Sequence, residues 1–325
     1  MSPSGTAPVA ALRTLDAATY ARDALHAEGV SWVEKNCYVD VWIELVHALG
    51  CDARAMLGFT ASIDFEDDQW TFFKPKHDEL FALYGIDVQE LNLWRPLADH
   101  VQTHVGAGRL VAVEADAFWL PDTAGTDYRQ QHTKTTIIIN AFDSAAQTLG
   151  YFHNASYHAL AGEDFARTFR VGAAVDPAYM PFYAEVIRVD RLVQRAEPEL
   201  RALAAAQLVK HATRRPRNNP VARFGARVTA DVEQLRAEGL AVYHAWAFAN
   251  LRQLGAAMEL CAQHLLWLGG EQRVTAAAEL SKVSEGAKTL IMKCARAVNG
   301  KRPLDAAALI DEMAAAWERG MERLS

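Results

Sequence analysis

The chain has 325 residues, of which 51% are hydrophobic and 22% are charged. This is the composition of a globular protein, long enough for one large domain or two of ordinary size. Its net charge of -7 argues against a general nucleic-acid binder and against a protein that adheres to anionic membranes. The chain has no basic segment followed by an apolar one at its start and no run of about eighteen apolar residues, so we expect a cytoplasmic protein without a membrane span.

The N-terminal part is predicted to contain a disordered tail and two helices. Residues 1–12 are rich in Ser, Pro, Ala and Gly, which favours disorder. Thr14 or Asp16 can cap a first helix that runs to about residue 28. A second helix is expected over residues 37–50, where apolar side chains recur with helical spacing at Val41, Leu45, Val46 and Leu49.

Short strands are predicted in the following part of the chain. Aromatic and β-branched residues gather at 55–64, 69–74, 109–116, 133–140 and 148–154. The last two of these segments flank a polar turn at 142–147 and therefore form a predicted β-hairpin. Asp78 can cap a short helix that ends before Gly85.

The C-terminal part has helical patterns almost throughout. Helices are expected near 182–212, 228–268, 271–298 and 304–323, with a basic linker at 210–227 that holds six Lys and Arg residues. We therefore predict three parts: the disordered residues 1–12, an α+β domain over 13–175 and an all-helical domain over 176–325.

One of the four cysteines has a context that favours reactivity. Their spacing contains no Cys-x-x-Cys motif, which argues against a zinc site and a disulfide framework. Cys51, Cys261 and Cys294 lie within or beside apolar helical runs, so we assign them to packing. Cys37 opens the predicted second helix, and a thiol at a helix N-terminus gains from the positive end of the helix dipole. Cys37 is thus a candidate nucleophile, with burial in the core as the alternative.

The predicted hairpin offers a base for this cysteine. His132 lies at the start of its first strand, and Asn154 lies at the end of the returning strand. A cysteine on a helix, then a histidine on a strand and an Asn or Asp on the next strand is the order found in papain-like cysteine enzymes. His153 competes with His132 for the role of base, and Asp143 at the turn could orient either imidazole.

Other candidate site residues lie outside this set. Gln69 and Asn36 could donate hydrogen bonds to an oxyanion. Asp116 could bind an amine, with Trp119 and Trp70 as further substrate-binding candidates. Asp116 also has an ordinary structural interpretation, as a strand-end carboxylate.

Five blocks of the sequence resemble a known family. They are Asn36–His47, Asp64–Lys74, Leu83–Glu90, Leu120–Tyr128 and Tyr151–Asn154. These blocks look like the signature of an uncharacterised bacterial family of domains of unknown function, often encoded beside amino acid–carrier protein ligases and small carrier proteins. The resemblance covers nearly the whole chain.

The first half also resembles, more distantly, the N-terminal domain of the butirosin-biosynthesis acyltransferase. That family is similar to papain-like enzymes and transfers an acyl group from a carrier-protein thioester to an amine. The resemblance implies a papain-like fold, a helix plus an antiparallel sheet, with Cys37 as nucleophile, His132 as base and Asn154 as the residue that orients the imidazole. The glutamine that papain-like enzymes place a few residues before the cysteine is absent from residues 31–36.

The resemblance implies a cysteine-dependent acyl- or aminoacyltransferase. It would take its acyl group from a phosphopantetheine thioester on a carrier protein, pass it to a small amine or alcohol, and hold no cofactor of its own. The carrier protein is acidic and would dock on the basic linker, through Arg214, Arg215, Arg217 and Arg223. Two alternatives stay open: a thioesterase or amidase with the same Cys-His-Asn set, and a non-catalytic protein that binds the aminoacyl carrier protein. The helical half could form a homodimer interface or a lid, and the pattern does not choose between them.

Overall fold

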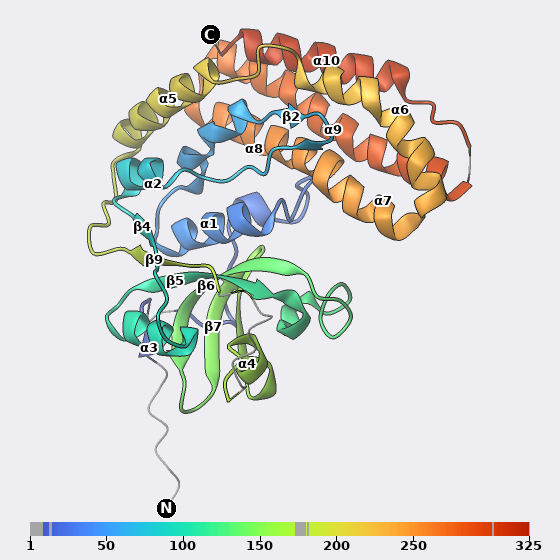
Figure 1. The fold of residues 1–325 in the computed structure, drawn as a ribbon. Coiled ribbons are helices and arrows are strands. Elements are labelled where there is room, and N and C mark those ends of the chain that lie inside the picture. Colours follow the sequence, from blue (N-terminus) through green and yellow to red (C-terminus); the bar gives the residue numbers. More distant parts are fainter. Residues whose placement is uncertain (1–8, 13–14, 173–179, 181, 301, 325) are drawn as a thin grey trace, which may run out of the picture. The chain divides into compact units, whose positions relative to one another are not determined.

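The computed structural model describes residues 9–12, 15–172, 180, 182–300 and 302–324 (Figure 1). The chain forms two compact units, each assembled from separate stretches of sequence. We call the first the sheet unit, which comprises residues up to 27, 36–51 and 80–194, and the second the helical unit, which comprises residues 28–35, 52–79 and 195–325. The helix α2 (His77–Tyr84) lies across the change from one unit to the other.

The sheet unit is built on an antiparallel sheet with the strand order β4-β9-β5-β6-β7-β8, and β1 pairs with β6. Its strands are β1 (Val9–Ala10), β4 (Asp87–Glu90), β5 (Leu110–Asp116), β6 (Lys134–Asp143), β7 (Thr148–His153), β8 (Ser156–Ala161) and β9 (Ala184–Arg188). The strand β6 is central and the longest of these, because its run of Thr and Ile residues suits a strand buried on both faces.

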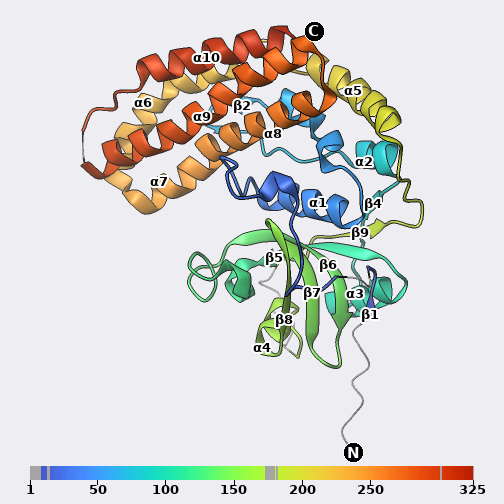
Figure 2. The same cartoon turned by 180° about the vertical axis from the view of Figure 1, so that it is seen from behind.

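Helices cover both faces of this sheet. The helix α1 (Cys37–Ala48) packs on one face, and α3 (Leu97–Gly106) and α4 (Glu163–Thr168) pack on the other (Figures 1 and 2). Side chains alternate between the two faces along a strand. Ile137 and Ile139 of β6 therefore join the core with α3 and α4, whereas Thr136 and Ile138 project towards α1.

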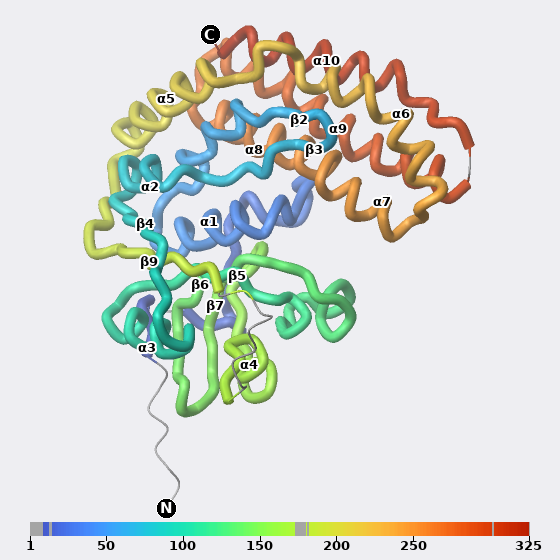
Figure 3. Tube along the Cα trace, in the orientation of Figure 1, coloured from blue at the N-terminus to red at the C-terminus, as the bar shows by residue number. Residues whose placement is uncertain are grey.

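The helical unit contains six helices of the C-terminal half of the described chain, together with earlier segments that pack among them (Figure 3). The helices are α5 (Glu197–Thr213), α6 (Pro220–Glu238), α7 (Leu240–Ala247), α8 (Gln253–Leu268), α9 (Glu271–Gly300) and α10 (Ala307–Glu322). The earlier segments are the 3-10 helix η2 (Ala53–Ser62) and a small hairpin of β2 (Phe65–Glu66) and β3 (Gln69–Trp70). A turn of π-helix, η5 (Phe248–Arg252), joins α7 to α8.

Much of the predicted α+β organisation is confirmed. The helix at Cys37 begins at the expected residue, the hairpin of β6 and β7 forms, α2 ends before Gly85, and the C-terminal part is helical. The predicted domain boundary at residues 175 and 176 lies outside the described residues.

Several local predictions are wrong. The predicted strand at 55–64 is the 3-10 helix η2. Residues 17–28 form a turn, an irregular segment and the short 3-10 helix η1 (Ala24–His26) in place of an α-helix. Val9–Ala10, within the predicted disordered tail, pair with β6. The predicted helix at 182–212 begins with β9, and the basic linker is mostly helix, because α6 starts at Pro220 after the capping residue Asn219.

Candidate functional site

Cys37 is the first residue of α1, and Asn36 caps this helix. The Asn36 side-chain oxygen accepts hydrogen bonds from the backbone N–H groups of Tyr38 and Val39 at 3.1 and 2.9 Å. These are two of the N–H groups at a helix start that have no partner within the helix. Asn36 therefore acts as the N-cap through its side-chain oxygen, and only its amide Nδ2 could donate a hydrogen bond to an oxyanion.

The Cys37 thiol lies over the face of the sheet that carries Thr136. Its Sγ is 3.9 Å from Thr136 Oγ1, and the residue is partly exposed. Among the described residues, no imidazole lies within hydrogen-bond distance of Sγ, and the Cys37 backbone N–H has no acceptor. The site thus combines a partly exposed cysteine with an unused N–H donor of the same residue.

The residue after Cys37 fixes the start of α1 against the sheet. Tyr38 donates a hydrogen bond to Glu185 Oε2 of β9 at 3.0 Å, and Tyr183 donates to the other oxygen of Glu185 at 2.9 Å. Burial and the neighbouring Glu185 carboxylate raise the pKa of the Tyr38 hydroxyl, so that Tyr38 acts as a donor at neutral pH.

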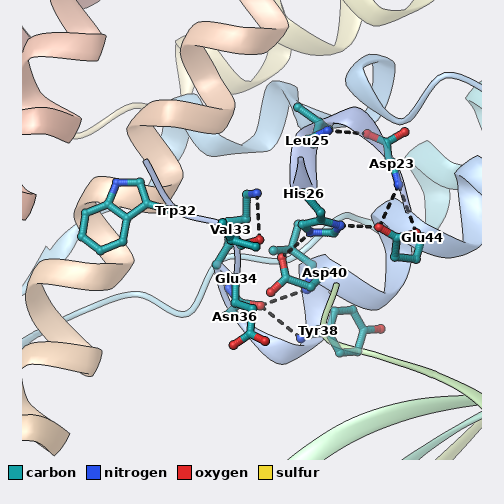
Figure 4. A network of polar contacts seen from close by, with 12 residues as sticks. Asp23, Leu25, His26, Trp32, Val33, Glu34, Asn36, Tyr38, Asp40 and Glu44 are labelled. Carbon is teal, nitrogen blue, oxygen red and sulfur yellow. Dashed lines mark hydrogen bonds and ion pairs between the residues drawn. The ribbon is translucent and has the colours of Figure 1, made fainter. Parts of the chain in front are cut away.

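A buried network holds the middle of α1 (Figure 4). His26 contacts Glu44 through Nδ1 and lies 3.1 Å from Asp40 Oδ1 through Nε2, and all three side chains are fully buried. Tyr20 and the backbone N–H of Asp23 donate to the Glu44 carboxylate as well. A neutral imidazole has one N–H, so both contacts are hydrogen bonds only if the ring or one carboxyl carries an additional proton. The network fixes the rotation of the helix that presents Cys37.

His132 has a carboxylate partner that differs from the expected Asn154. Its Nδ1 lies 2.6 Å from Asp116 Oδ2, and its ring stacks on Phe118 with the centroids 4.4 Å apart. The imidazole is 69% exposed, so its Nε2 is open to solvent or a ligand. Asp116 therefore orients His132. One oxygen of the Asp116 carboxylate is engaged by this contact, whereas the predicted role of Asp116 was to bind an amine directly.

Asn154 lies in the tight turn between β7 and β8. Its φ is 46°, in the left-handed region that Asn tolerates better than most residues. Among the described residues, no hydrogen bond joins Asn154 to His132. The geometry thus gives Asn154 the role of a turn residue.

His153, the alternative base, lies in a buried network on the opposite face of the sheet. Its Nδ1 is 2.5 Å from Asp122 Oδ2 and its Nε2 is 2.7 Å from Thr135 Oγ1, while Tyr151 donates to the other oxygen of Asp122. Thr135 and Thr136 are consecutive residues of β6 and project from opposite faces. His153 is therefore separated from Cys37 by the sheet itself.

Asp122 is the charged centre of this second network. Burial raises the pKa of Asp122, but the hydrogen bond and the charge of His153 outweigh that effect, so the net pKa lies below its usual value. The sequence block that begins Leu120-Pro-Asp contains this residue, and the block Tyr151–Asn154 contains its histidine. The blocks were recognisable in the sequence, but their pairing depends on long-range contacts.

The remaining predicted site residues lie elsewhere. Trp119 packs against the guanidinium groups of Arg129 and Arg167, which lie 4.5 and 5.5 Å from its ring centroid. Gln69 and Trp70 belong to β3 in the helical unit, whereas Cys37 belongs to the sheet unit.

The four arginines predicted to dock a carrier protein divide into two pairs. Arg223 bonds to Asp64 and to the Phe65 carbonyl, and Arg215 bonds to the Met321 carbonyl. Both are thus engaged within the helical unit. Arg214 and Arg217 are exposed, and they form no ion pair within the part of the chain that the structure describes.

In the described ranges, no group of three or more His, Cys, Asp or Glu side chains is arranged to hold a metal ion. Nor does any helix there combine the length and the apolar character that a membrane crossing requires.

Comparison with family models gives two matches that together cover most of the chain. Residues 21–189 match the model of the DUF1839 N-terminal domain, and residues 197–325 match that of the DUF1839 C-terminal domain. No curated protein matches the sequence.

Proposed function

The chain belongs to the DUF1839 family, and we propose that it is a cysteine-dependent acyl- or aminoacyltransferase with Cys37 as the nucleophile. The observation that carries this proposal is a partly exposed cysteine as the first residue of α1, with its own backbone N–H free of any acceptor among the described residues. An N–H in that position can stabilise the oxyanion that forms when the sulfur attacks a carbonyl carbon.

The surroundings of Cys37 favour a thioester substrate over an amide. When the Cys37 thiolate attacks a thioester, a new carbon–sulfur bond forms, the old one breaks, and the departing thiolate carries away the negative charge. This exchange needs no proton transfer, whereas an amine leaving group must be protonated by an acid. A site without an imidazole on Sγ is therefore better suited to an acyl group on a phosphopantetheine thiol of a carrier protein.

We assign His132 to the second step. An acceptor amine attacks the Cys37 thioester, a carbon–nitrogen bond forms, Cys37 leaves as the thiolate, and the amine proton passes to His132 Nε2. Asp116 pairs with Lys134 in register and so projects from the same face of the sheet as Thr136 and the Cys37 contact. The dyad of Asp116 and His132 is anchored on that face, which supports this role.

The same site can serve hydrolysis if water replaces the acceptor amine. A papain-like relationship, through the butirosin-type acyltransferase, agrees with a cysteine helix packed on an antiparallel sheet. The catalytic residues differ from the expected Cys37, His132 and Asn154 in that Asp116 takes the place of Asn154.

An acidic carrier protein would dock on the exposed Arg214 and Arg217, since Arg215 and Arg223 are engaged within the helical unit.

Acyl-enzyme formation tests the proposal. Incubation of the full chain with a leucyl thioester of N-acetylcysteamine, followed by intact-protein mass spectrometry, should show a one-leucyl adduct. Cys37→Ala should abolish the adduct. Cys51→Ala should retain it, because Cys51 is the other partly exposed cysteine in the described chain and so is the matched control. A leucyl adduct on the Cys37→Ala variant, or the absence of an adduct on the unsubstituted chain, would overturn the proposal.

A second measurement separates transfer from hydrolysis. With an added amine, the unsubstituted chain should release leucyl amide product, whereas free leucine alone would identify a hydrolase. His132→Gln should keep the adduct but slow its transfer on the order of 10²-fold, the usual contribution of a general base. Equal loss of both steps would instead indicate a structural role for His132.

A further inference from the structure

The helical unit contains a cavity of about 270 Å³ between the β2–β3 hairpin and the π-helical turn before α8. Three aromatic side chains, Trp70, Phe72 and Phe248, provide much of its lining, and Glu66, Gln69 and Gln253 supply polar groups. The volume is just below the usual range of small-molecule sites, which suits a small ligand, and an apolar lining with a few polar groups is typical of such sites.

Gln253 is the unusual residue of this cavity. Its side chain belongs to a residue that is only 2% exposed, and neither its amide nitrogen nor its amide oxygen has a hydrogen-bond partner in the structure. Trp70 adds a third buried group without a partner, its indole N–H. Buried polar groups are nearly always paired, because leaving one unpaired costs the full desolvation free energy. Gln253 also lines the cavity, so a ligand bound there is the natural source of the partner that its amide lacks.

The backbone next to Gln253 supports the same interpretation. Phe248–Arg252 form one turn of π-helix between two α-helices. Such a turn holds one residue more than an α-helical turn, and π-turns occur frequently at functional sites. Here the turn supplies Phe248 and leads directly to Gln253, so the irregularity coincides with the cavity.

The charge of the cavity selects the class of ligand. Glu66 is exposed, and its carboxylate forms no ion pair within the described ranges. No Lys or Arg lines the cavity, and the nearby Arg252 is already bonded to the Glu34 carbonyl and lies 5.5 Å from the Phe248 centroid. A carboxylate beside several aromatic rings attracts an organic cation, through ion pairing and through the negative faces of the rings.

We propose that this cavity binds a small organic ammonium compound that carries an adjacent amide or carbonyl group and an apolar body. The ammonium group pairs with Glu66, the amide or carbonyl pairs with the Gln253 side chain, and the apolar part packs on the aromatic rings. The site is independent of Cys37 and of the acyl transfer proposed above.

Binding of a matched pair of probes tests the ligand class. L-Leucinamide carries all three features, and 4-methylpentanamide has the same skeleton without the ammonium group. Isothermal titration of the full chain at pH 7 should show binding of L-leucinamide at least about tenfold tighter than that of its neutral analogue. Equal affinities, or no binding of L-leucinamide up to its solubility, would overturn the proposal.

Three variants locate the site. Gln253→Leu should abolish L-leucinamide binding and yet raise the melting temperature by about 2–4 °C, because it removes unpaired buried polar atoms. Glu66→Gln should remove the preference for the ammonium probe. Asp68→Asn, an exposed residue of the same hairpin turn that does not line the cavity, should leave binding unchanged. Loss of stability in Gln253→Leu together with unchanged binding would contradict the assignment.

The outcome is separable from that of the proposed function. Cys37→Ala should bind L-leucinamide as tightly as the unsubstituted chain, since Cys37 belongs to the other unit. A chain that binds the probe but forms no acyl-enzyme would retain this site and refute only the catalytic proposal.

Discussion

The buried histidines of this protein differ in what their ring nitrogens contact. His26, His153 and His211 each contact a carboxylate, whereas His264 donates from Nδ1 to the Arg54 carbonyl at 2.7 Å and its Nε2 has no partner. Burial lowers the pKa of His264 to about 4, because a charged imidazolium would lose its hydration without gaining a carboxylate. His264 is therefore neutral in the folded chain at neutral pH.

This difference predicts how stability depends on pH. The unfolded chain protonates His264 near pH 6.5, whereas the folded chain resists protonation down to about pH 4. Between these values the unfolded state binds more protons, so the free energy of unfolding falls as the pH falls, by about 3 kcal/mol in total. His264→Asn should remove that part of the slope. Urea unfolding of both proteins at several pH values between 4 and 7 measures it, and parallel curves would contradict the prediction.

Single residues were predictable from the sequence only where their role is local. Cys37 at the start of a helix follows from the apolar spacing after it. The partner of His132 was not predictable, because Asp116 lies sixteen positions earlier and comes close only through the pairing of β5 with β6. The network of His153 needs a third segment, the loop that carries Asp122.

At the scale of elements, α1 depends on its cap. Asn36 is 2% exposed and bonds to two N–H groups of the first turn. Asn36→Ala should lower the free energy of unfolding by about 1–2 kcal/mol. Asn36→Asp should lower it much less, because a carboxylate oxygen accepts the same hydrogen bonds. Urea denaturation measures both changes. Equal stability of the Ala and Asp variants would show that the cap contributes little.

The wrong prediction of a strand at residues 55–64 has a physical cause. Residues 55–64 form a short apolar run with aromatic and β-branched members, which fits a strand and a buried helical turn equally well. The chain adopts the 3-10 helix η2 because α5 and α8 pack on it, and these helices lie more than a hundred residues away in sequence. The sheet strands were easier, because β5, β6 and β7 are neighbours in sequence and pair in order.

At the scale of the whole molecule, the chain passes five times from one unit to the other, after residues 27, 35, 51, 79 and 194. A linear division of the sequence, such as that of the family models between 189 and 197, therefore does not coincide with the compact units. Within the helical unit, His211 pairs with Glu79, Arg223 with Asp64, and the Trp32 indole donates to Ser284.

This arrangement predicts the behaviour of the two halves of the chain. Residues 195–325 expressed alone should remain unfolded or molten, because the fragment lacks η2 and leaves the buried His211 without its carboxylate. Co-expression with residues 1–194 should restore a stable complex. Thermal unfolding followed by circular dichroism, together with size-exclusion chromatography, measures both outcomes. A cooperative melting transition for residues 195–325 alone would contradict the prediction.

Adjacent residues of the strand β6 contact two different networks on the two faces of the sheet. Thr135 faces His153, and Thr136 faces Cys37. An irregularity in the pairing of β6 with β7, between Ile139 and Ala141, ends the regular register of this segment. Deletion or insertion of one residue before that point would exchange the two threonines and turn every following apolar side chain to the wrong face. Homologous chains should therefore tolerate substitutions between residues 134 and 139 more readily than any change in the length of that segment.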